Sequence, residues 1–227
     1  MAVKLTWLGH ACWSIETPGG TVLIDPFLTG NPKAAAKAED VKADFILVSH
    51  GHGDHIGDTV AIAKRTGATV ISNFEIASYC DKQGCNVHPL HIGGSREFKF
   101  GRVKLTIAHH GSALPDGSNG GNPCGFLLTI GKIKIYDAAD TGLFYDMKLI
   151  GDEKLDAALI PIGDNFTMGP DDAARAAKLL RAKILIPMHY NTFDLIKQDP
   201  KAFATRAKKA APKTKVVVLN PGESFSV

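Results

Sequence analysis

Four side chains that commonly bind metal ions lie close together in the segment 49–55. Residues two apart in an extended chain project to the same side, so His50 and His52 can bind one ion. The glycines between the histidines allow a tight turn, which can direct Asp54 and His55 to a second position beside the first. Imidazole and carboxylate groups suit zinc, manganese or iron, and no cysteine lies nearby to favour a closed structural zinc site. The spacing predicts a metal centre, and the alternative is a histidine-rich turn with solvated or capping side chains.

Further candidate ligands follow apolar segments later in the chain. They are the pair His109 and His110, then Asp140, and then His189. Folds that cover sheets with helices place their sites where buried strands end. Each residue alone is also typical of a hydrogen-bonded loop position. Together with the first cluster, their number matches two sites of three ligands each and one bridging carboxylate.

The elements that must position these residues are short strands followed by strands that alternate with helices. This order predicts sheets covered by helices, an α+β arrangement, and the polar loop 111–125 is a candidate lid. Asp58 is expected to cap the helix that starts at Thr59, and Gly67 to end it. We expect strands at 3–8, 12–17, 21–25, 45–48, 68–72, 103–108, 126–130, 133–136, 157–161, 184–187 and 215–219, and helices at 33–40, 59–66, 73–83, 170–180 and 200–211.

The composition is that of an ordinary globular chain of 227 residues, with 26 Lys and Arg against 23 Asp and Glu. A net charge of +3 is too mild to indicate nucleic acid as a partner. The longest apolar runs are far below the roughly 20 residues of a membrane span, and the start of the chain lacks a signal-peptide pattern. No linker divides the chain, so we expect a single domain over 1–227. The sequence is compatible with a monomer or a homo-oligomer. Four cysteines without C-x-x-C spacing suggest reduced thiols and a cytoplasmic location: Cys12, Cys80, Cys85 and Cys124.

Taken together, these motifs resemble the metallo-β-lactamase superfamily. The likeness rests on S-H-G-H-G-D-H at 49–55, the later histidine, A-D-T-G at 139–142 and M-H at 188–189. More closely, the chain resembles stand-alone metal-dependent hydrolases related to ascorbate-phosphate lactonase. Those share W-L-G-H-A, here at 7–11, I-D-P-F at 24–27 and P-I-G-x-x-F-T-M-x-P at 161–170. The resemblance implies a four-layer αββα sandwich with the site at one edge of the two sheets.

The resemblance also implies a ligand set for two divalent metal ions, zinc first, with manganese or iron as alternatives. His109 is the weaker member of its pair, because neighbouring residues of a strand point to opposite faces. The first ion would take His50, His52 and His110, the second would take Asp54, His55 and His189, and Asp140 would bridge them.

Two such ions can hold a water between them and lower its pKa to near 7. The resulting hydroxide would attack a carbonyl or phosphoryl centre, with Asp54 as a catalytic group that orients it. The expected activity is hydrolysis of an ester, lactone or phosphodiester bond in a small molecule. The di-iron branch of the superfamily carries Glu where this chain has His52, which weakens a redox interpretation. A nuclease or phosphodiesterase acting on nucleic acid, and a metal-binding sensor without turnover, are the alternatives.

Three more residues are candidates for substrate contact or for support of the ligands. His10 either reaches the site or is bonded to backbone in a tight turn. Asp25 is expected to accept a hydrogen bond from a ligand histidine, since such imidazoles usually donate their other N–H. Asn165 either stabilises an oxyanion or occupies a left-handed turn.

Overall fold

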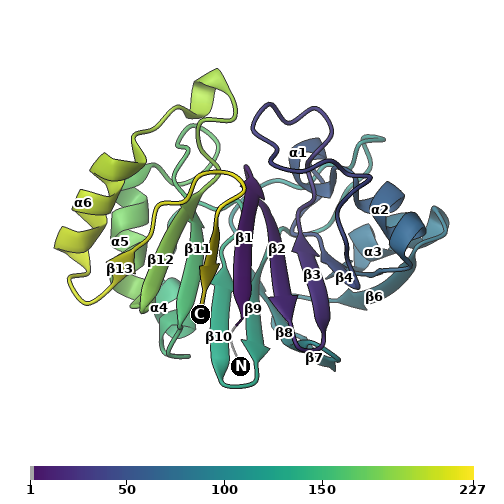
Figure 1. Ribbon diagram of the computed structural model, residues 1–227, viewed down its shortest axis with the longest axis horizontal. Helices are drawn as coiled ribbons and strands as arrows, with labels where there is room; N and C mark the ends of the chain where they lie inside the picture. The colour runs from purple at the N-terminus through teal and green to yellow at the C-terminus, as the bar shows by residue number, and fades with distance from the viewer. Residues whose placement is uncertain (1–2) are drawn as a thin grey trace.

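Two seven-stranded sheets face each other in the computed structural model, which describes residues 3–227 (Figure 1). The first sheet has the order β14-β1-β2-β3-β4-β5-β6, with antiparallel pairs at the β1 end and parallel pairs from β3 to β6. Its strands are β1 (Lys4–Gly9), β2 (Cys12–Thr17), β3 (Gly20–Ile24), β4 (Phe45–Leu47), β5 (Thr69–Asn73), β6 (Asn86–Leu90) and β14 (Ser224–Ser226).

The second sheet has the order β13-β12-β11-β10-β9-β8-β7. It is antiparallel from β7 to β10 and parallel from β10 to β13. Its strands are β7 (Ser95–Phe98), β8 (Gly101–Ile107), β9 (Cys124–Ile130), β10 (Ile133–Asp137), β11 (Ala157–Pro161), β12 (Ile184–Met188) and β13 (Lys215–Val216).

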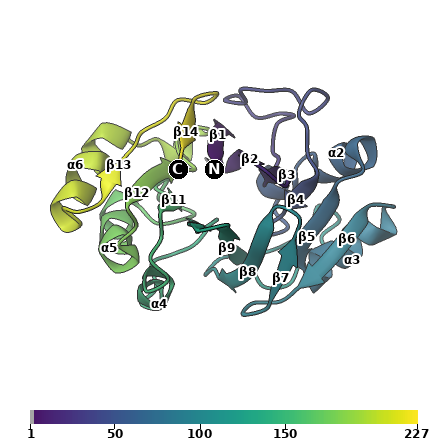
Figure 2. The same ribbon diagram turned by 60° about the horizontal axis from the view of Figure 1, so that its bottom comes forward.

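Helices cover the outer face of each sheet, which gives the four layers (Figure 2). α2 and α3 pack on the first sheet, and α5 and α6 pack on the second, where α4 packs against α5. The predicted αββα sandwich is therefore confirmed. The helices are α1 (Gly53–Ile56), α2 (Thr59–Thr66), α3 (Phe74–Lys82), α4 (Met147–Gly151), α5 (Pro170–Leu180) and α6 (Pro200–Ala210), with a 3₁₀ turn η1 (Asp194–Ile196).

The main core lies between the sheets and holds their largest buried side chains. Trp13 of β2, Phe126 of β9 and Tyr136 of β10 are all fully buried. Trp13 also donates its indole N–H to Met188 Sδ on the opposite sheet, at 3.2 Å. Met188 directly precedes a candidate ligand, so packing between the sheets fixes the end of β12 that carries His189. Burying large aromatic rings in this way is the dominant favourable contribution to such a core.

Two expectations about local structure are wrong. Residues 33–40 form turns instead of a helix, because Asn31 Oδ1 accepts the Lys33 N–H and the Ala35 N–H is bonded to Leu8 O. Asp58 occupies the N-cap position of α2 as expected, but its side chain makes no capping hydrogen bond there. Its carboxylate accepts the backbone N–H groups of Leu28 and Thr29 instead, which holds the turn after β3 against α2.

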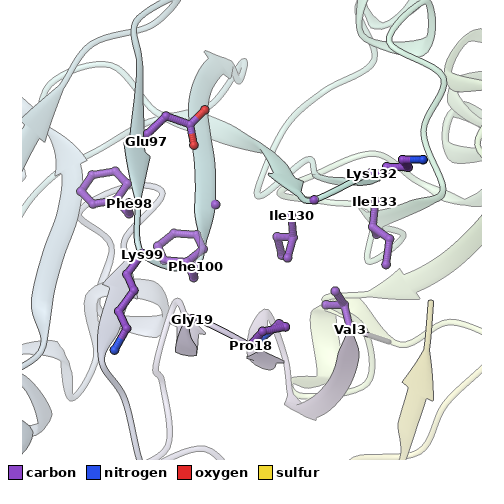
Figure 3. A pocket seen from close by; sticks show the side chains of 12 residues that line it. Val3, Pro18, Gly19, Glu97, Phe98, Lys99, Phe100, Ile130, Lys132 and Ile133 are labelled. Carbon is purple, nitrogen blue, oxygen red and sulfur yellow. The ribbon is translucent and has the colours of Figure 1, made fainter. Parts of the chain in front are cut away.

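A cavity of about 670 Å³ opens among the turns that join β2 to β3, β7 to β8 and β9 to β10 (Figure 3). Pro18, Phe100 and Ile130 line it, and none of the candidate metal ligands does. The histidines follow the opposite ends of the strands. Separately, no helix within residues 3–227 is long and apolar enough to cross a membrane.

Candidate metal centre

The candidate ligands meet at one edge of the two sheets. The segment that follows β4 carries His50 and His55, whereas Asp140 and His189 follow β10 and β12 of the second sheet. All four side chains are buried. Because these strands end at the same edge, residues far apart in the sequence converge there, as expected for sheets covered by helices.

The first group consists of His50, His52 and His110, whose candidate ligand atoms all lie within 4.8 Å of one another. His50 Nε2 is 3.0 Å from His52 Nδ1. Burial, together with the neighbouring His55, holds the pKa of His50 well below its usual value, and burial also lowers the pKa of His110. The His50 and His110 imidazoles are therefore held in the neutral form, which is the form that binds metal ions.

The second group consists of His10, Asp54, His55 and His189, again with candidate atoms within 4.8 Å. Asp140 lies between the two groups. Its Oδ2 atom is 3.0 Å from His189 Nε2 and 3.5 Å from His110 Nε2, so one carboxylate reaches a histidine of each group.

Several buried polar atoms at this point are left without hydrogen bonds. Within the described chain, His55 Nε2, His189 Nε2 and Asp140 Oδ1 have no hydrogen-bond partner. Buried polar atoms are nearly always paired, so unpaired atoms that face a common space need another partner. Imidazole nitrogens and carboxylate oxygens together suit borderline divalent cations such as zinc. The residues present therefore fit a metal centre.

Asp25 lies between His55 of the second group and Ser49, which contacts His50 of the first group. Its Oδ2 atom is 2.7 Å from His55 Nδ1 and accepts the Ser49 hydroxyl at 2.5 Å. Ser49 Oγ in turn lies 2.9 Å from His50 Nδ1. With both histidines donating from Nδ1, each leaves Nε2 free to bind a cation. Ser49 was not among the predicted site residues, although its position between a buried strand and His50 was a usable signal.

His10 lies inside the second group, and its backbone is also tightly bonded. Its Nε2 atom is 3.2 Å from Asp54 Oδ2, and its Nδ1 atom is 2.8 Å from Thr192 Oγ1. Its carbonyl accepts the Trp7 indole N–H and the His189 N–H, which holds a left-handed backbone with φ of 55°. Burial and the neighbouring His189 lower the pKa of His10 to about 4, so the ring is neutral. His10 therefore both reaches the site and is held by backbone hydrogen bonds in a tight turn. No pattern in the sequence indicated Thr192 as its partner.

The remaining candidates lie outside the two groups. His109 is exposed and packs edge-on against Phe144, with ring centroids 5.1 Å apart, so it points away as expected. Asn165 is exposed with φ of 53°, which fits a left-handed turn. The loop 111–125 is held in place at both ends: Ser112 Oγ accepts the Gly51 N–H, and the Asn73 amide donates to Asn122 O.

A pair of facing sheets between helices, with histidines and aspartates converging at one edge, defines the class of metallo-β-lactamase-fold metalloproteins. The family model of the beta-lactamase superfamily domain matches residues 4–189. The chain belongs to the metallo-β-lactamase superfamily and is a metal-dependent hydrolase.

Relatives of known name agree with this assignment. A metal-dependent hydrolase of Bacillus cereus is 53% identical over 231 aligned residues, covering 99% of this chain and all of the relative. The solved structure of a metallo hydrolase from the archaeon Ignicoccus hospitalis is 36% identical, with a TM-score of 0.92 over 100% of this chain and 99% of the other. An isothiocyanate hydrolase from Delia radicum gut bacteria shares the fold at 21% identity and a TM-score of 0.77, covering 99% and 98% of the chains.

Proposed function

We propose that this hydrolase binds two divalent metal ions, zinc first with manganese or iron as alternatives, and cleaves an ester, lactone or phosphodiester bond of a small molecule. The observation that carries the proposal is the position of the buried Asp140 carboxylate between His110 of the first group and His189 of the second, with Asp140 Oδ1 and His189 Nε2 lacking hydrogen-bond partners in the described part of the chain. A carboxylate with unpaired oxygen lone pairs at that point suits a bridge between two cations.

Each of the two groups of side chains would supply the ligands of one ion. His50, His52 and His110 would hold one ion, Asp54, His55 and His189 the other, and Asp140 both. Bound there, divalent ions supply Lewis acidity and lower the pKa of a coordinated water.

Asp54 is the group of this centre best placed to orient a water, because its side chain is 32% exposed while His10, His55 and His189 beside it are buried. Burial alone would raise the pKa of Asp54, but the hydrogen bond with His10 holds it well below the usual range. Asp54 therefore stays ionised and can orient a water through its carboxylate. His10 donates to the Asp54 carboxylate when Thr192 bonds to the other ring nitrogen, which fixes the direction of that carboxylate.

The thiols are consistent with a cytoplasmic enzyme, which we also propose. All four cysteines are free and buried. Burial raises the pKa of the Cys80 thiol to about 12, which keeps it protonated and unreactive.

Elemental analysis of the purified protein, combined with a substrate panel, tests the proposal. The panel contains a p-nitrophenyl ester, a lactone, bis-p-nitrophenyl phosphate and a thioester. We expect two ions per chain, and we expect His52→Ala to lose metal and to lower kcat/KM at least about 100-fold. The matched control is His109→Ala, an exposed histidine of the neighbouring loop, which should keep both. Less than one ion per chain without rescue by zinc or manganese, or an unchanged His52→Ala variant, contradicts the proposal. Turnover of nucleic acid that weakens steeply with salt would favour the nuclease alternative.

A further inference from the structure

Two aromatic rings stand directly beside the candidate metal centre. Phe27 lies in the turn after β3, and Phe193 lies just before η1; their ring centroids are 6.3 Å apart. Both rings meet His10 edge-on, at 5.7 Å and 5.5 Å. The segments that carry them rise at the top of Figure 1, one from each sheet. Since His10 contacts Asp54, the aromatic pair is one side chain away from the proposed ligands.

Apolar side chains are also exposed on the segment that carries Phe193 and on the loop that it contacts. Phe193 is 39% exposed, Leu195 is 68% exposed, and Phe166 on the loop between β11 and α5 is 54% exposed. The two loops touch each other, because the Gln198 side chain donates to Gly163 O at 3.1 Å. Exposed large apolar side chains grouped at the edge of a site indicate a surface that a ligand covers.

Basic side chains are nearly missing from the segments that surround the centre. Residues 49–58, 109–123, 138–146 and 162–169 contain no Lys or Arg. Within 189–199 the one cation is Lys197, whose Nζ is 2.8 Å from Asp194 Oδ1. In the turn after β3 the first cation is Lys33. Within residues 3–227, neither forms a hydrogen bond or ion pair with a candidate ligand. The same segments carry acidic groups, including Asp54 and Asp164.

We propose that Phe27 and Phe193 form an apolar subsite for an uncharged group of the substrate. The inference rests on the proposed function, because the subsite is placed relative to the proposed metal ions. Those ions would compensate negative charge at the reacting bond itself. A second anionic group further out would meet aspartates and aromatic rings, and Lys197 beside Phe193 is already paired with Asp194, so the anion would lose hydration with little compensation. The substrate is therefore a small ester or lactone with an apolar arm, or a phosphodiester whose arms are uncharged.

A matched pair of esters tests the charge and the apolar contact together. p-Nitrophenyl butyrate and the p-nitrophenyl monoester of succinic acid share the leaving group and chain length but differ in a terminal carboxylate. We expect kcat/KM of the wild-type metal-loaded protein to be at least about tenfold higher for the butyrate. Phe193→Ala should lower that ratio about three- to tenfold, and Phe193→Leu should retain most of it. Leu149→Ala, at an exposed apolar position on the outer helix α4, is the control and should change nothing.

A binding measurement separates this inference from the proposed chemistry. Saturation-transfer NMR with benzyl alcohol should show contact with wild-type protein that is lost in Phe193→Ala, whereas benzoate should show little contact. If no ester, lactone or phosphodiester is cleaved but the alcohol still binds through Phe193, the proposed reaction is wrong and the subsite stands. Equal turnover of both esters, or benzyl alcohol binding that Phe193→Ala leaves unchanged, overturns the subsite. A dimer that Phe193→Ala converts to monomer also overturns it, because the surface would then belong to a second copy.

Discussion

At the residue scale, the centre includes buried polar groups outside the proposed ligand set. Asp25 accepts hydrogen bonds from His55 and from Ser49, and Ser49 passes the contact on to His50. One buried carboxylate thereby orients one histidine of each proposed metal position. Removing such a hydrogen-bond partner of a metal ligand typically weakens metal binding by roughly 10- to 100-fold.

Replacing Ser49 by Ala should therefore weaken metal binding about tenfold, because the His50 Nδ1–H loses its acceptor while the ligand set stays intact. Asp25→Asn should weaken it further, since both histidines are then affected. Competition with a chelating dye measures the affinity independently of turnover. Ser72→Ala is the matched control: Ser72 is also buried next to this segment, but its hydroxyl donates to Val48 O. Equal affinities for Ser49→Ala and Ser72→Ala would show that Ser49 only fills space.

At the scale of elements, close backbone contacts set where the helices lie. Gly151 ends α4, and a Cβ atom there would overlap the carbonyl oxygens of Leu179 and Leu180 at the end of α5. Backbone atoms cannot move aside as a flexible side chain can, so α4 and α5 would have to separate. Gly67, by contrast, ends α2 with φ of 76° and has no atom within 4 Å of such a Cβ.

We expect Gly151→Ala to lower the free energy of unfolding by about 2–3 kcal/mol through overpacking. Gly67→Ala should lower it by only about 1 kcal/mol, through left-handed backbone strain. Urea denaturation at neutral pH compares the two variants under one set of conditions. A larger loss for Gly67→Ala would mean that the α4–α5 contact relaxes freely.

The central strands of the two sheets were easier to predict from the sequence than the edge strands. Continuous apolar runs such as 45–48 and 157–161 have few alternatives to a buried strand. The edge strands β6, β7 and β14 were not predictable in this way. β6 contains Pro89, which a sequence argument assigns to a loop but which an edge strand tolerates. The alanine-rich segment 33–40 suggested a helix by propensity, and bonds from Asn31 and Leu8 to its backbone outweighed that preference.

At the scale of the whole molecule, the ligand candidates were predictable and their surroundings were not. His50, His52, Asp54 and His55 share a short segment, so the spacing alone placed them together. Thr192 and Phe193 come next to the centre only because β12 and the turn after β3 reach the same edge. Such contacts depend on how the two sheets face each other, which no local pattern encodes.

The proposed two-ion site would make the stability of the whole molecule depend on bound metal. The proposed ligands come from both sheets: His50 and His55 from the first, Asp140 and His189 from the second. Bound ions would hold the sheets together at this edge and would satisfy atoms that are otherwise buried and unpaired, including His189 Nε2. Ligands that bind only the folded state stabilise it by about 2.7 kcal/mol when present at 100 times Kd.

Chelation should accordingly lower Tm by about 5 to 10 °C for each ion lost, given about 2–4 °C per kcal/mol for a chain of this size. Calorimetry before and after chelator treatment measures the shift, and readdition of zinc or manganese should restore it. His109→Ala should respond as the wild type does, because its side chain lies outside both groups. His50→Ala should have a lower Tm at the outset and a smaller response to chelator, because the first ion is already lost. A Tm that chelator leaves unchanged in a protein shown to contain metal would mean that the ions do not join the two sheets.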